Sequence, residues 1–355
     1  MLESGFQKDV IPPTQNNVSL SPHVVILGAG ASVAAFPNGD KKGYELPLMQ
    51  SLVKLLNLDK ILPQEYYLLL NDFEELYNGI SINPSLSRIK TDIDDILYQY
   101  FYNLRIPDTP TLYDYLILSL REKDIIATVN WDPLLLQCLR RHHKIKKRLP
   151  NVIFLHGNVA VGICPDCHIS GYKYNQICHR CYKPFQPLKL LYPIHKKDYT
   201  EDESINREWK QLKGYLSQAL FITIYGYSAP ESDIEAKNLM LEAIKANKSR
   251  VFSEIEIIDI KSKTEIENSW HHFFYKTHYR SIDSLQQSYL WFHPRRSCDA
   301  FFSAYAMNSP FDNNPFPAFN TIDEMHDWIE PLLKDERKVE AKQSMFTYKA
   351  NQLYK

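Results

Sequence analysis

Five short apolar runs constrain the fold of this 355-residue chain more than any other feature. Each run is four to seven residues long, is rich in β-branched side chains and shows little alternation of apolar and polar residues. Such runs are typical of strands that are covered on both faces, as in a parallel sheet. They are Val24–Leu27, Ile125–Val129, Val152–Leu155, Leu220–Tyr225 and Glu254–Ile260.

Segments with apolar residues at three- and four-residue spacing separate these runs and predict helices. The expected helices span 46–56, 66–76, 89–104, 111–121, 208–219 and 233–246. Strands that alternate with helices predict an α/β fold, a Rossmann-like parallel sheet with helices on both faces. Two more helices, at 298–307 and 321–333, predict a C-terminal helical appendage followed by a polar terminus of low order.

Two segments interrupt this alternation and suggest how the chain is divided. We expect residues 1–157 and 196–280 to form the Rossmann-like domain. Residues 158–195 hold two cysteine pairs and no long periodic run, so we expect an inserted zinc-ribbon-like module. Residues 281–355 would form the C-terminal helical extension.

Four of the six cysteines form two C-x-x-C pairs. They are Cys164, Cys167, Cys178 and Cys181. Four thiolates at this spacing complete the tetrahedral coordination of zinc and leave no position for water, which predicts a structural zinc ion, Zn²⁺. A redox role fits less well, because both pairs lie in one short module. Cys138 and Cys298 are isolated and are expected to be packed in the core.

Charge and hydropathy exclude several classes of partner. Lys and Arg together number 41 and Asp and Glu 42, so there is no overall basic field and we do not expect direct nucleic-acid binding. The basic run Arg140–Arg148 is expected to be a solvated helix end. No stretch has the length of a membrane span, and the N-terminus lacks the order of a signal peptide. We therefore expect a cytoplasmic protein with no membrane partner.

A glycine turn follows the first predicted strand. It reads Gly28-Ala29-Gly30-Ala31-Ser32. Its two glycines would allow a tight turn and a close approach of the backbone to a phosphate group. The same pattern also fits a turn whose glycines serve only packing.

The other predicted strands also end in polar residues or glycine. Asn130 and Asp132 follow the second strand, and His156 follows the third. Asp132 is suited to cap a helix that starts at Pro133, and a lone His156 also fits a hydrogen-bonded core residue. The fourth and fifth strands are followed by Gly226, Ser228 and Asp259. Five such ends on one edge of a parallel sheet imply a crevice for a polar ligand.

The order of these motifs resembles the sirtuin family. The resemblance runs from Val24 to Ile260 and rests on the glycine turn, Thr128-Val129-Asn130-Trp131-Asp132, His156-Gly157, the four cysteines and Gly226-Tyr227-Ser228. It implies a Rossmann-like domain that carries a small zinc domain, with NAD as the cofactor.

The resemblance also implies a role for each strand end. Gly28-Ala29-Gly30-Ala31-Ser32 would bind the pyrophosphate of NAD. Asn130 and Asp132 would line the nicotinamide and ribose pocket, and His156 would be the catalytic base. The contacts on the adenosine side would come from Gly226, Ser228 and Asp259.

The sequence departs from the sirtuins that deacylate proteins. Val129 stands where they have Gln, and Leu190–Pro193 replaces the Phe-Gly-Glu of their peptide-pairing strand. The sequence Gly226-Tyr227-Ser228-Ala229-Pro230, followed by Asp233, resembles the prokaryotic sirtuin-like proteins of antiviral defence. Members of that branch hydrolyse NAD, often within larger assemblies.

The leading hypothesis is therefore an NAD glycohydrolase that releases nicotinamide and ADP-ribose. Asn130 would orient the ribose and the attacking water, and His156 would act as general base, a task suited to imidazole with its ordinary pKa of ~6.5. The alternatives are an NAD-dependent protein lysine deacylase and a non-enzymatic subunit that senses NAD or ADP-ribose. Because unrestrained hydrolysis would deplete the NAD of the cell, we expect gating by homo-oligomerisation or by a partner protein. The resemblance implies a HerA-type ATPase as that partner.

Overall fold

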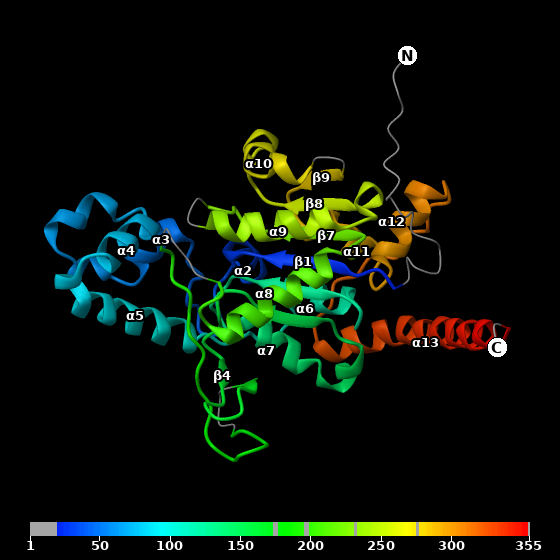
Figure 1. Ribbon diagram of the computed structural model, residues 1–355, viewed down its shortest axis with the longest axis horizontal. Coiled ribbons are helices and arrows are strands. Elements are labelled where there is room, and N and C mark those ends of the chain that lie inside the picture. The colour runs from blue at the N-terminus through cyan, green and yellow to red at the C-terminus, as the bar shows by residue number, and fades with distance from the viewer. Residues whose placement is uncertain (1–19, 173–176, 195–198, 231–232, 275–276, 354–355) are drawn as a thin grey trace.

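A six-stranded parallel sheet forms the centre of the computed structural model, which describes residues 20–172, 177–194, 199–230, 233–274 and 277–353 (Figure 1). Its strands are β1 (His23–Leu27), β2 (Ile125–Thr128), β3 (Asn151–Phe154), β7 (Phe221–Tyr225), β8 (Glu254–Ile258) and β9 (His278–Ile282). The first five coincide with the five predicted runs to within two residues at either end, so the strand predictions are confirmed.

The order of these strands is that of a doubly wound sheet. It runs β3-β2-β1-β7-β8-β9, which is 3-2-1-4-5-6 when only the strands of this sheet are numbered along the chain. The direction of winding reverses between β1 and β7, which pair in parallel from His23 and Phe221 to Leu27 and Tyr225. In open α/β sheets, ligands bind at the carboxyl ends of the strands beside such a switch point.

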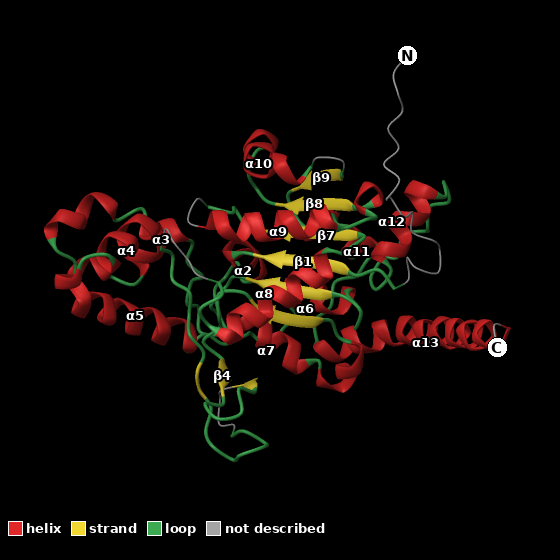
Figure 2. Ribbon diagram, viewed as in Figure 1, coloured by secondary structure: helices red, strands yellow, loops and turns green. Residues whose placement is uncertain are grey.

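Two layers of helices cover the sheet, as predicted. One face carries α2 (Ala29–Ala35), α6 (Leu112–Ser119) and α7 (Leu134–Arg141). The other carries α8 (Glu203–Leu216), α9 (Ile234–Ala246) and α10 (Lys263–Trp270). Alternate side chains of β1 divide between them: Val25 and Leu27 pack into the first layer, and Val24 and Ile26 into the second. The helices α3 (Met49–Leu55), α4 (Phe73–Ser81) and α5 (Ser87–Tyr102) lie beyond the carboxyl ends of the strands (Figure 1). Figure 2 shows the strand arrowheads pointing toward the side that carries α3, α4 and α5.

The sixth strand, β9, was not predicted. It pairs in parallel with β8 and lies at the edge of the sheet. Its sequence, His-Tyr-Arg-Ser-Ile, is half-exposed and lacks the apolar run of a strand covered on both faces. The predicted division into domains stays a prediction, and β9 runs across its boundary at residue 280.

The prediction of a single helix over residues 66–76 is wrong. Residues Gln64–Leu69 form a 3₁₀ helix, and α4 begins only at Phe73. The Asp72 side chain accepts a hydrogen bond from the amide of Glu75 at 3.2 Å and so caps the start of α4. A strong N-cap inside a periodic apolar segment therefore starts a new helix.

The cysteine-rich segment forms a separate three-stranded antiparallel sheet. Its central strand β4 (Val161–Ile163) pairs with β5 (Ser170–Tyr172) and with β6 (Gln186–Pro187). The segment leaves the main sheet after β3 and rejoins it at α8, in agreement with the predicted inserted module (Figure 1).

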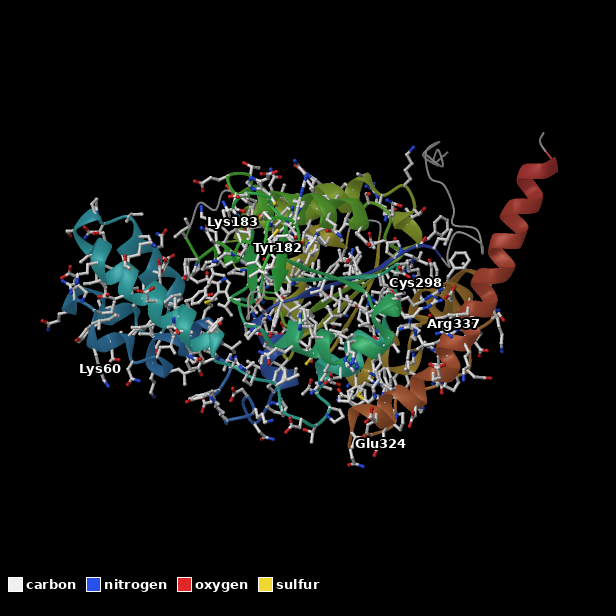
Figure 3. All side chains as sticks on the ribbon, turned by 90° about the horizontal axis from the view of Figure 1, so that it is seen from below. Lys60, Tyr182, Lys183, Cys298, Glu324 and Arg337 are labelled. Atoms are coloured by element: carbon white, nitrogen blue, oxygen red, sulfur yellow. The ribbon has the colours of Figure 1, made fainter. Side chains whose placement is uncertain are left out.

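The C-terminal part of the chain packs against the main domain and then extends away from it. It contains α11 (Tyr289–Phe292), α12 (Ser297–Ala306) and α13 (Ile322–Leu353). Met325, Ile329 and Leu333 of α13 are fully buried in the core. Figure 3 places Lys60, near α3, and Arg337 of α13 at opposite ends of the molecule. No helix in the described residues is long and apolar enough to cross a membrane.

The predicted end of the last helix at residue 333 is wrong, because α13 continues to Leu353. Pro331 lies inside this helix and removes one backbone hydrogen-bond donor. Burial of the apolar face and the ion pair between Arg295 and Glu336, one turn later, stabilise the helix across this point.

The expectation of a solvated helix end at Arg140–Arg148 is also wrong in part. Arg140 and Lys144 are exposed, but His142 is fully buried. His142 Nε2 lies 3.0 Å from Asp114 Oδ1, and Arg141 Nε donates to the same oxygen at 2.6 Å. Asp114 keeps a pKa of about 2 despite its burial, because these two residues stabilise its charged form.

Candidate functional site

The carboxyl edge of the sheet brings the five predicted strand ends together. Because β3, β2, β1, β7 and β8 are consecutive neighbours, the residues that follow them form one row. In the order of the sheet these residues are His156, Asn130, Gly28, Gly226 and Asp259. The row crosses the switch point between Gly28 and Gly226.

The glycines at the switch point are required by contact between two turns. Gly28 N donates to Tyr225 O, and Gly30 N donates to Gly226 O, both at 3.0 Å. A Cβ atom on Gly28 would lie 2.5 Å from Gly226 O, and one on Gly30 would lie 2.9 Å from Gly226 Cα. Gly226 has φ of +60°, a region that favours glycine. The glycines of the turn therefore serve packing, which is one of the two explanations considered from the sequence. The binding of pyrophosphate by this turn stays a prediction.

Asn130 is held against the glycine turn. Its Nδ2 donates to Gly28 O at 2.9 Å and to Ser32 Oγ at 3.0 Å. Ser32 Oγ in turn donates to Asp132 Oδ2 at 2.8 Å and lies 2.7 Å from the hydroxyl of Tyr113. Residues from α2, from the loop after β2 and from α6 are thus joined in one hydrogen-bonded group, in which Asn130 is half-buried and the other three are buried.

Asp132 caps α7, as considered from the sequence, and also binds Ser32, while its place in the nicotinamide and ribose pocket stays a prediction. Its Oδ1 accepts a hydrogen bond from Leu134 N at 3.0 Å, at the start of α7. Its Oδ2 accepts the bond from Ser32. Burial raises the pKa of Asp132, while these two hydrogen bonds act in the opposite direction. Asp132 therefore supports the Asn130 group as well as the helix.

His156 belongs to a second hydrogen-bonded group, on the side of the sheet that carries α8 and α9. Its Nε2 lies 3.4 Å from the hydroxyl of Tyr199 and 4.0 Å from Asp233 Oδ1. Tyr227 donates a hydrogen bond to Asp233 Oδ2 at 2.8 Å. The rings of His156 and Tyr199 are stacked, with centroids 5.8 Å apart. His156, Tyr199, Tyr227 and Asp233 are all buried.

The segment after the zinc module closes over the ends of β2 and β3. Leu191 N donates to His156 O at 3.0 Å, and Leu191 O accepts from Trp131 Nε1 at 3.2 Å. Gly157 has φ of +79°, and a Cβ there would collide with the carbonyl of Lys189. The backbone of Leu191 is therefore occupied by internal hydrogen bonds.

Two predicted site residues lie apart from both groups. Ser228 is exposed, and Asp259 is half-buried with its Oδ1 accepting from Lys261 N at 3.0 Å. Their assignment to the adenosine side stays a prediction.

Three functional candidates were missed from the sequence. They are Tyr113, Tyr199 and Tyr227 as hydrogen-bonding residues. Tyr113 lies in an apolar predicted helix, Tyr227 lies between Gly226 and Ser228, and no local pattern sets Tyr199 apart from an ordinary tyrosine.

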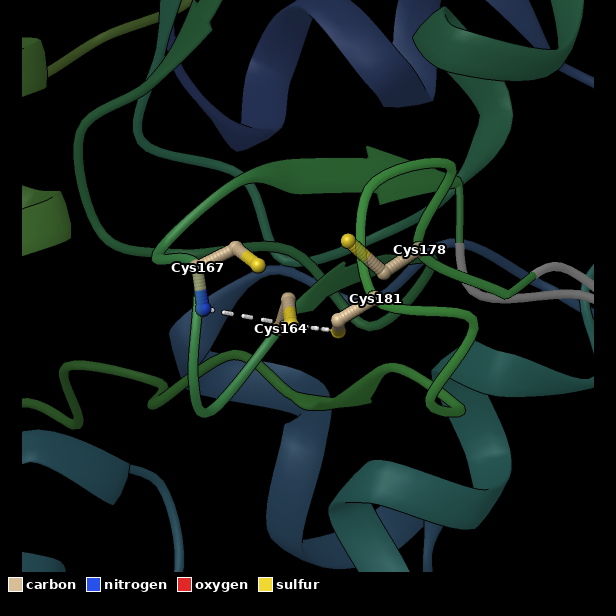
Figure 4. A group of neighbouring side chains, drawn as sticks. All are labelled: Cys164, Cys167, Cys178 and Cys181. Atoms are coloured by element: carbon tan, nitrogen blue, oxygen red, sulfur yellow. Dashed lines mark hydrogen bonds between the residues drawn. The ribbon is translucent and has the colours of Figure 1, made fainter.

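The four predicted zinc ligands converge in the small module (Figure 4). The Sγ atoms of Cys164, Cys167, Cys178 and Cys181 all lie within 4.8 Å of one another. A tetrahedral zinc ion with Zn–S bonds of ~2.3 Å separates its sulfur ligands by about 3.8 Å. The Cys167 amide also donates to Cys164 Sγ at 3.4 Å. The cluster fits a structural zinc ion with four thiolate ligands and no position for water.

Two cavities lie away from the row of strand ends. One, of about 720 Å³, is bounded by the face of α5, the end of α3 and the loop at Lys42 and Tyr44. The other, of about 240 Å³, lies between α9 and Phe273. Neither is lined by a residue of the two hydrogen-bonded groups.

Comparison with known proteins gave matches only among solved structures. No family model matches the chain. No curated protein matches it either. The chain is similar to a structure concerned with sirtuin substrate affinity, at 17% identity over 74% of this chain and 88% of that one, with a TM-score of 0.39. It is also similar to a Sir2 homologue in complex with NAD, at 16% identity over 75% and 86% of the two chains, with a TM-score of 0.38.

A third similar structure is a Sir2 homologue variant in complex with ADP-ribose. It is 15% identical over 69% of this chain and 82% of that one, with a TM-score of 0.33. The roles of the site residues rest on the geometry of this chain.

Proposed function

We propose that this protein is an NAD glycohydrolase, which cleaves the bond between nicotinamide and ribose to give nicotinamide and ADP-ribose. The observation that carries the proposal is the placement of Asn130 and His156. They follow two adjacent strands at the carboxyl edge of a doubly wound sheet, beside the glycine turn at its switch point. This edge is where folds of this class bind dinucleotides.

The chemistry needs little acid assistance. Nicotinamide leaves NAD as a neutral molecule from a positively charged pyridinium, through an oxocarbenium-like state at C1′. Water then bonds to C1′, and the proton it loses passes to a base and then to solvent. His156 is the base in this proposal, acting on the water or on a ribose hydroxyl.

Asn130 positions the reactants. Its Nδ2 is occupied by Gly28 O and Ser32 Oγ, so its carbonyl oxygen Oδ1 is the group it can offer to a ribose hydroxyl or to water. The two internal hydrogen bonds fix the amide in one orientation before substrate binds.

The segment at Leu191 favours hydrolysis over protein deacylation. In a deacylase, an acyl-lysine peptide needs an open strand edge with which to pair. In this chain, the N–H of Leu191 is bonded to His156 O and its carbonyl to Trp131 Nε1. A peptide could pair there only by displacing these contacts.

The test is chromatography of NAD incubated with purified protein in the absence of peptide. We expect nicotinamide and ADP-ribose from the wild type. Asn130→Ala and His156→Ala should each lower the rate by about 100-fold or more, the usual contribution of a general base or positioned donor. His143→Ala, at an exposed histidine, is the matched control and should retain activity.

Unimpaired NAD loss in both site variants would contradict the proposal. Turnover only after addition of an acyl-lysine peptide would establish the deacylase instead. Binding of NAD without any product, in the presence and absence of a partner, would favour the non-enzymatic sensor.

We further propose that the enzyme acts in the cytoplasm within an antiphage defence system, gated by homo-oligomerisation or by a HerA-type ATPase. Its support is the position of α13, which extends from the main domain on the side opposite α3–α5 (Figure 1). Deleting residues 339–355 keeps the buried residues Met325, Ile329 and Leu333. If the truncated protein matches the full chain in mass by light scattering and in NAD turnover, this surface is not the gate.

A further inference from the structure

A buried carboxylate faces the histidine of the site from a distant part of the chain. Asp233 lies at the start of α9, after β7, whereas His156 follows β3. Asp233 Oδ1 is 4.0 Å from His156 Nε2, and the two side chains are only 5% and 6% exposed. This distance is within the range of an ion pair and beyond that of a direct hydrogen bond. A buried charge at such a distance interacts strongly with an imidazolium ion.

Tyr227 holds this carboxylate in place. Its hydroxyl donates to Asp233 Oδ2 at 2.8 Å, and its ring packs edge-on against Trp270 at 5.9 Å between centroids. Burial and the charge of Asp233 raise the pKa of Tyr227 well above its ordinary value, so the hydroxyl remains a donor. The Asp233 side chain makes no capping bond to α9, so helix capping does not explain its burial.

We propose that Asp233 is a positioning residue for His156, and that its carboxylate stabilises the imidazolium formed when His156 takes up a proton. The catalytic part of this inference rests on the proposed function, in which His156 is the base. The electrostatic part concerns only the two side chains and holds whatever reaction the site performs.

The other groups around His156 do not supply this charge. Tyr199 stacks on the ring, and burial raises its pKa, so it stays neutral. Glu208 of α8 accepts a hydrogen bond from Phe154 N at 3.3 Å, and burial raises its pKa as well. Glu235 of α9 is exposed to solvent, which screens its charge. Among these groups, Asp233 is the one that combines burial, a fixed orientation and proximity.

The direct test is an NMR titration of the histidine ring signals in the full-length protein. The His156 signal is assigned by its loss in His156→Asn. A carboxylate at this distance raises the pKa of an imidazole by about 1 unit or more. Asp233→Asn, which keeps the shape of the side chain, should therefore lower the pKa of His156 by about that amount. Asp233→Ser is a second variant without the charge that retains a favourable residue at a helix start.

Glu235→Gln is the matched control, because it removes one negative charge from the first turn of the same helix without touching His156. We expect no resolved change in the His156 titration there. A lowered pKa in both Asp233 variants, together with an unchanged one in Glu235→Gln, supports the proposal. An unchanged His156 pKa in folded Asp233→Asn or Asp233→Ser overturns it.

The kinetic consequence is measured separately. A general base must be unprotonated, so the acid limb of kcat/KM for NAD reports its pKa. In Asp233→Asn this limb should move to lower pH by the same amount as the NMR titration, with a reduced plateau. A reduced plateau with an unmoved limb would mean a merely structural role. If the wild type does not hydrolyse NAD, the proposed function fails, while the NMR comparison still decides the role of Asp233.

Discussion

Gly226 is the residue at which the two turns of the site meet most closely. A Cβ on Gly226 would collide with the backbone nitrogen of Ala31 and lie 2.5 Å from the carbonyl carbon of Gly30. Its φ of +60° adds backbone strain for any other residue. Gly226 is therefore, with Gly28 and Gly30, one of the positions at which the contact between the two turns excludes a side chain.

Gly226→Ala should accordingly destabilise the protein by about 2 kcal/mol or more, because it combines steric collision with strain. Gly43→Ala is the matched control. Gly43 has φ of +82° but nothing within 4 Å of an added Cβ, so it should cost only about 1 kcal/mol of strain. Urea unfolding followed by circular dichroism measures both variants. Equal losses in the two would show that contact with Gly30 and Ala31 contributes nothing.

At the scale of an element, the small module has short strands and a small apolar cluster. Its three strands have two or three residues each, and the cluster at its base consists of Phe154, Val161 and Leu188. Its Cys164 and Cys178 side chains are fully buried in the cluster. Metal coordination then supplies the stability that a larger core would provide.

Cys178→Ser should reduce the zinc content from about one ion per chain to a small fraction, because a structural site needs all four thiolates. The central sheet should persist, because none of the four cysteine ligands lies in β1, β2 or β7. Elemental analysis and circular dichroism measure the two effects. His179→Ala, at the exposed neighbour of Cys178, is the control and should keep its zinc. Equal zinc in wild type and Cys178→Ser would rule out the four-cysteine site.

At the scale of the whole molecule, a buried ion pair joins the C-terminal extension to the main domain. Arg295 is 2% exposed and donates from Nη2 to Glu336 Oε2 of α13 at 2.9 Å. The same guanidinium donates to Leu120 O at 2.7 Å and to Arg148 O at 2.9 Å. The extension is thus fixed to segments at the amino ends of β2 and β3, opposite the site.

Glu336→Ala should lower the free energy of unfolding by about 3–5 kcal/mol, because it leaves the buried charge of Arg295 without its partner. Glu330→Ala is the matched control on the same helix. Glu330 pairs with Lys334 at 3.7 Å on the surface, so its loss should cost about 0.5 kcal/mol or less. The measurement is denaturant unfolding of the wild type, Glu336→Ala and Glu330→Ala, which gives the free energy of unfolding of each. A Glu336→Ala variant as stable as Glu330→Ala would mean that α13 does not depend on this pair.

Local sequence was sufficient for the features that depend on local chemistry. The five buried strands could be predicted because a strand covered on both faces needs an uninterrupted apolar run, as in Val24–Leu27. The metal cluster could be predicted because two C-x-x-C pairs bring four thiolates together. In contrast, the edge strand β9 could not be found, because half of its surface faces solvent and its sequence is polar.

The tertiary structure alone decided how the candidate site residues are grouped. Asn130 and His156 lie at the same edge of the sheet, as the sequence predicted, but they belong to hydrogen-bonded groups on opposite sides of the sheet. Ser32 and Tyr113 join the first group, and Asp233 joins the second, from segments far away in the chain. Sequence determines what each strand ends in, because that is local; which side chains then meet depends on the order and winding of the strands, which no single segment contains.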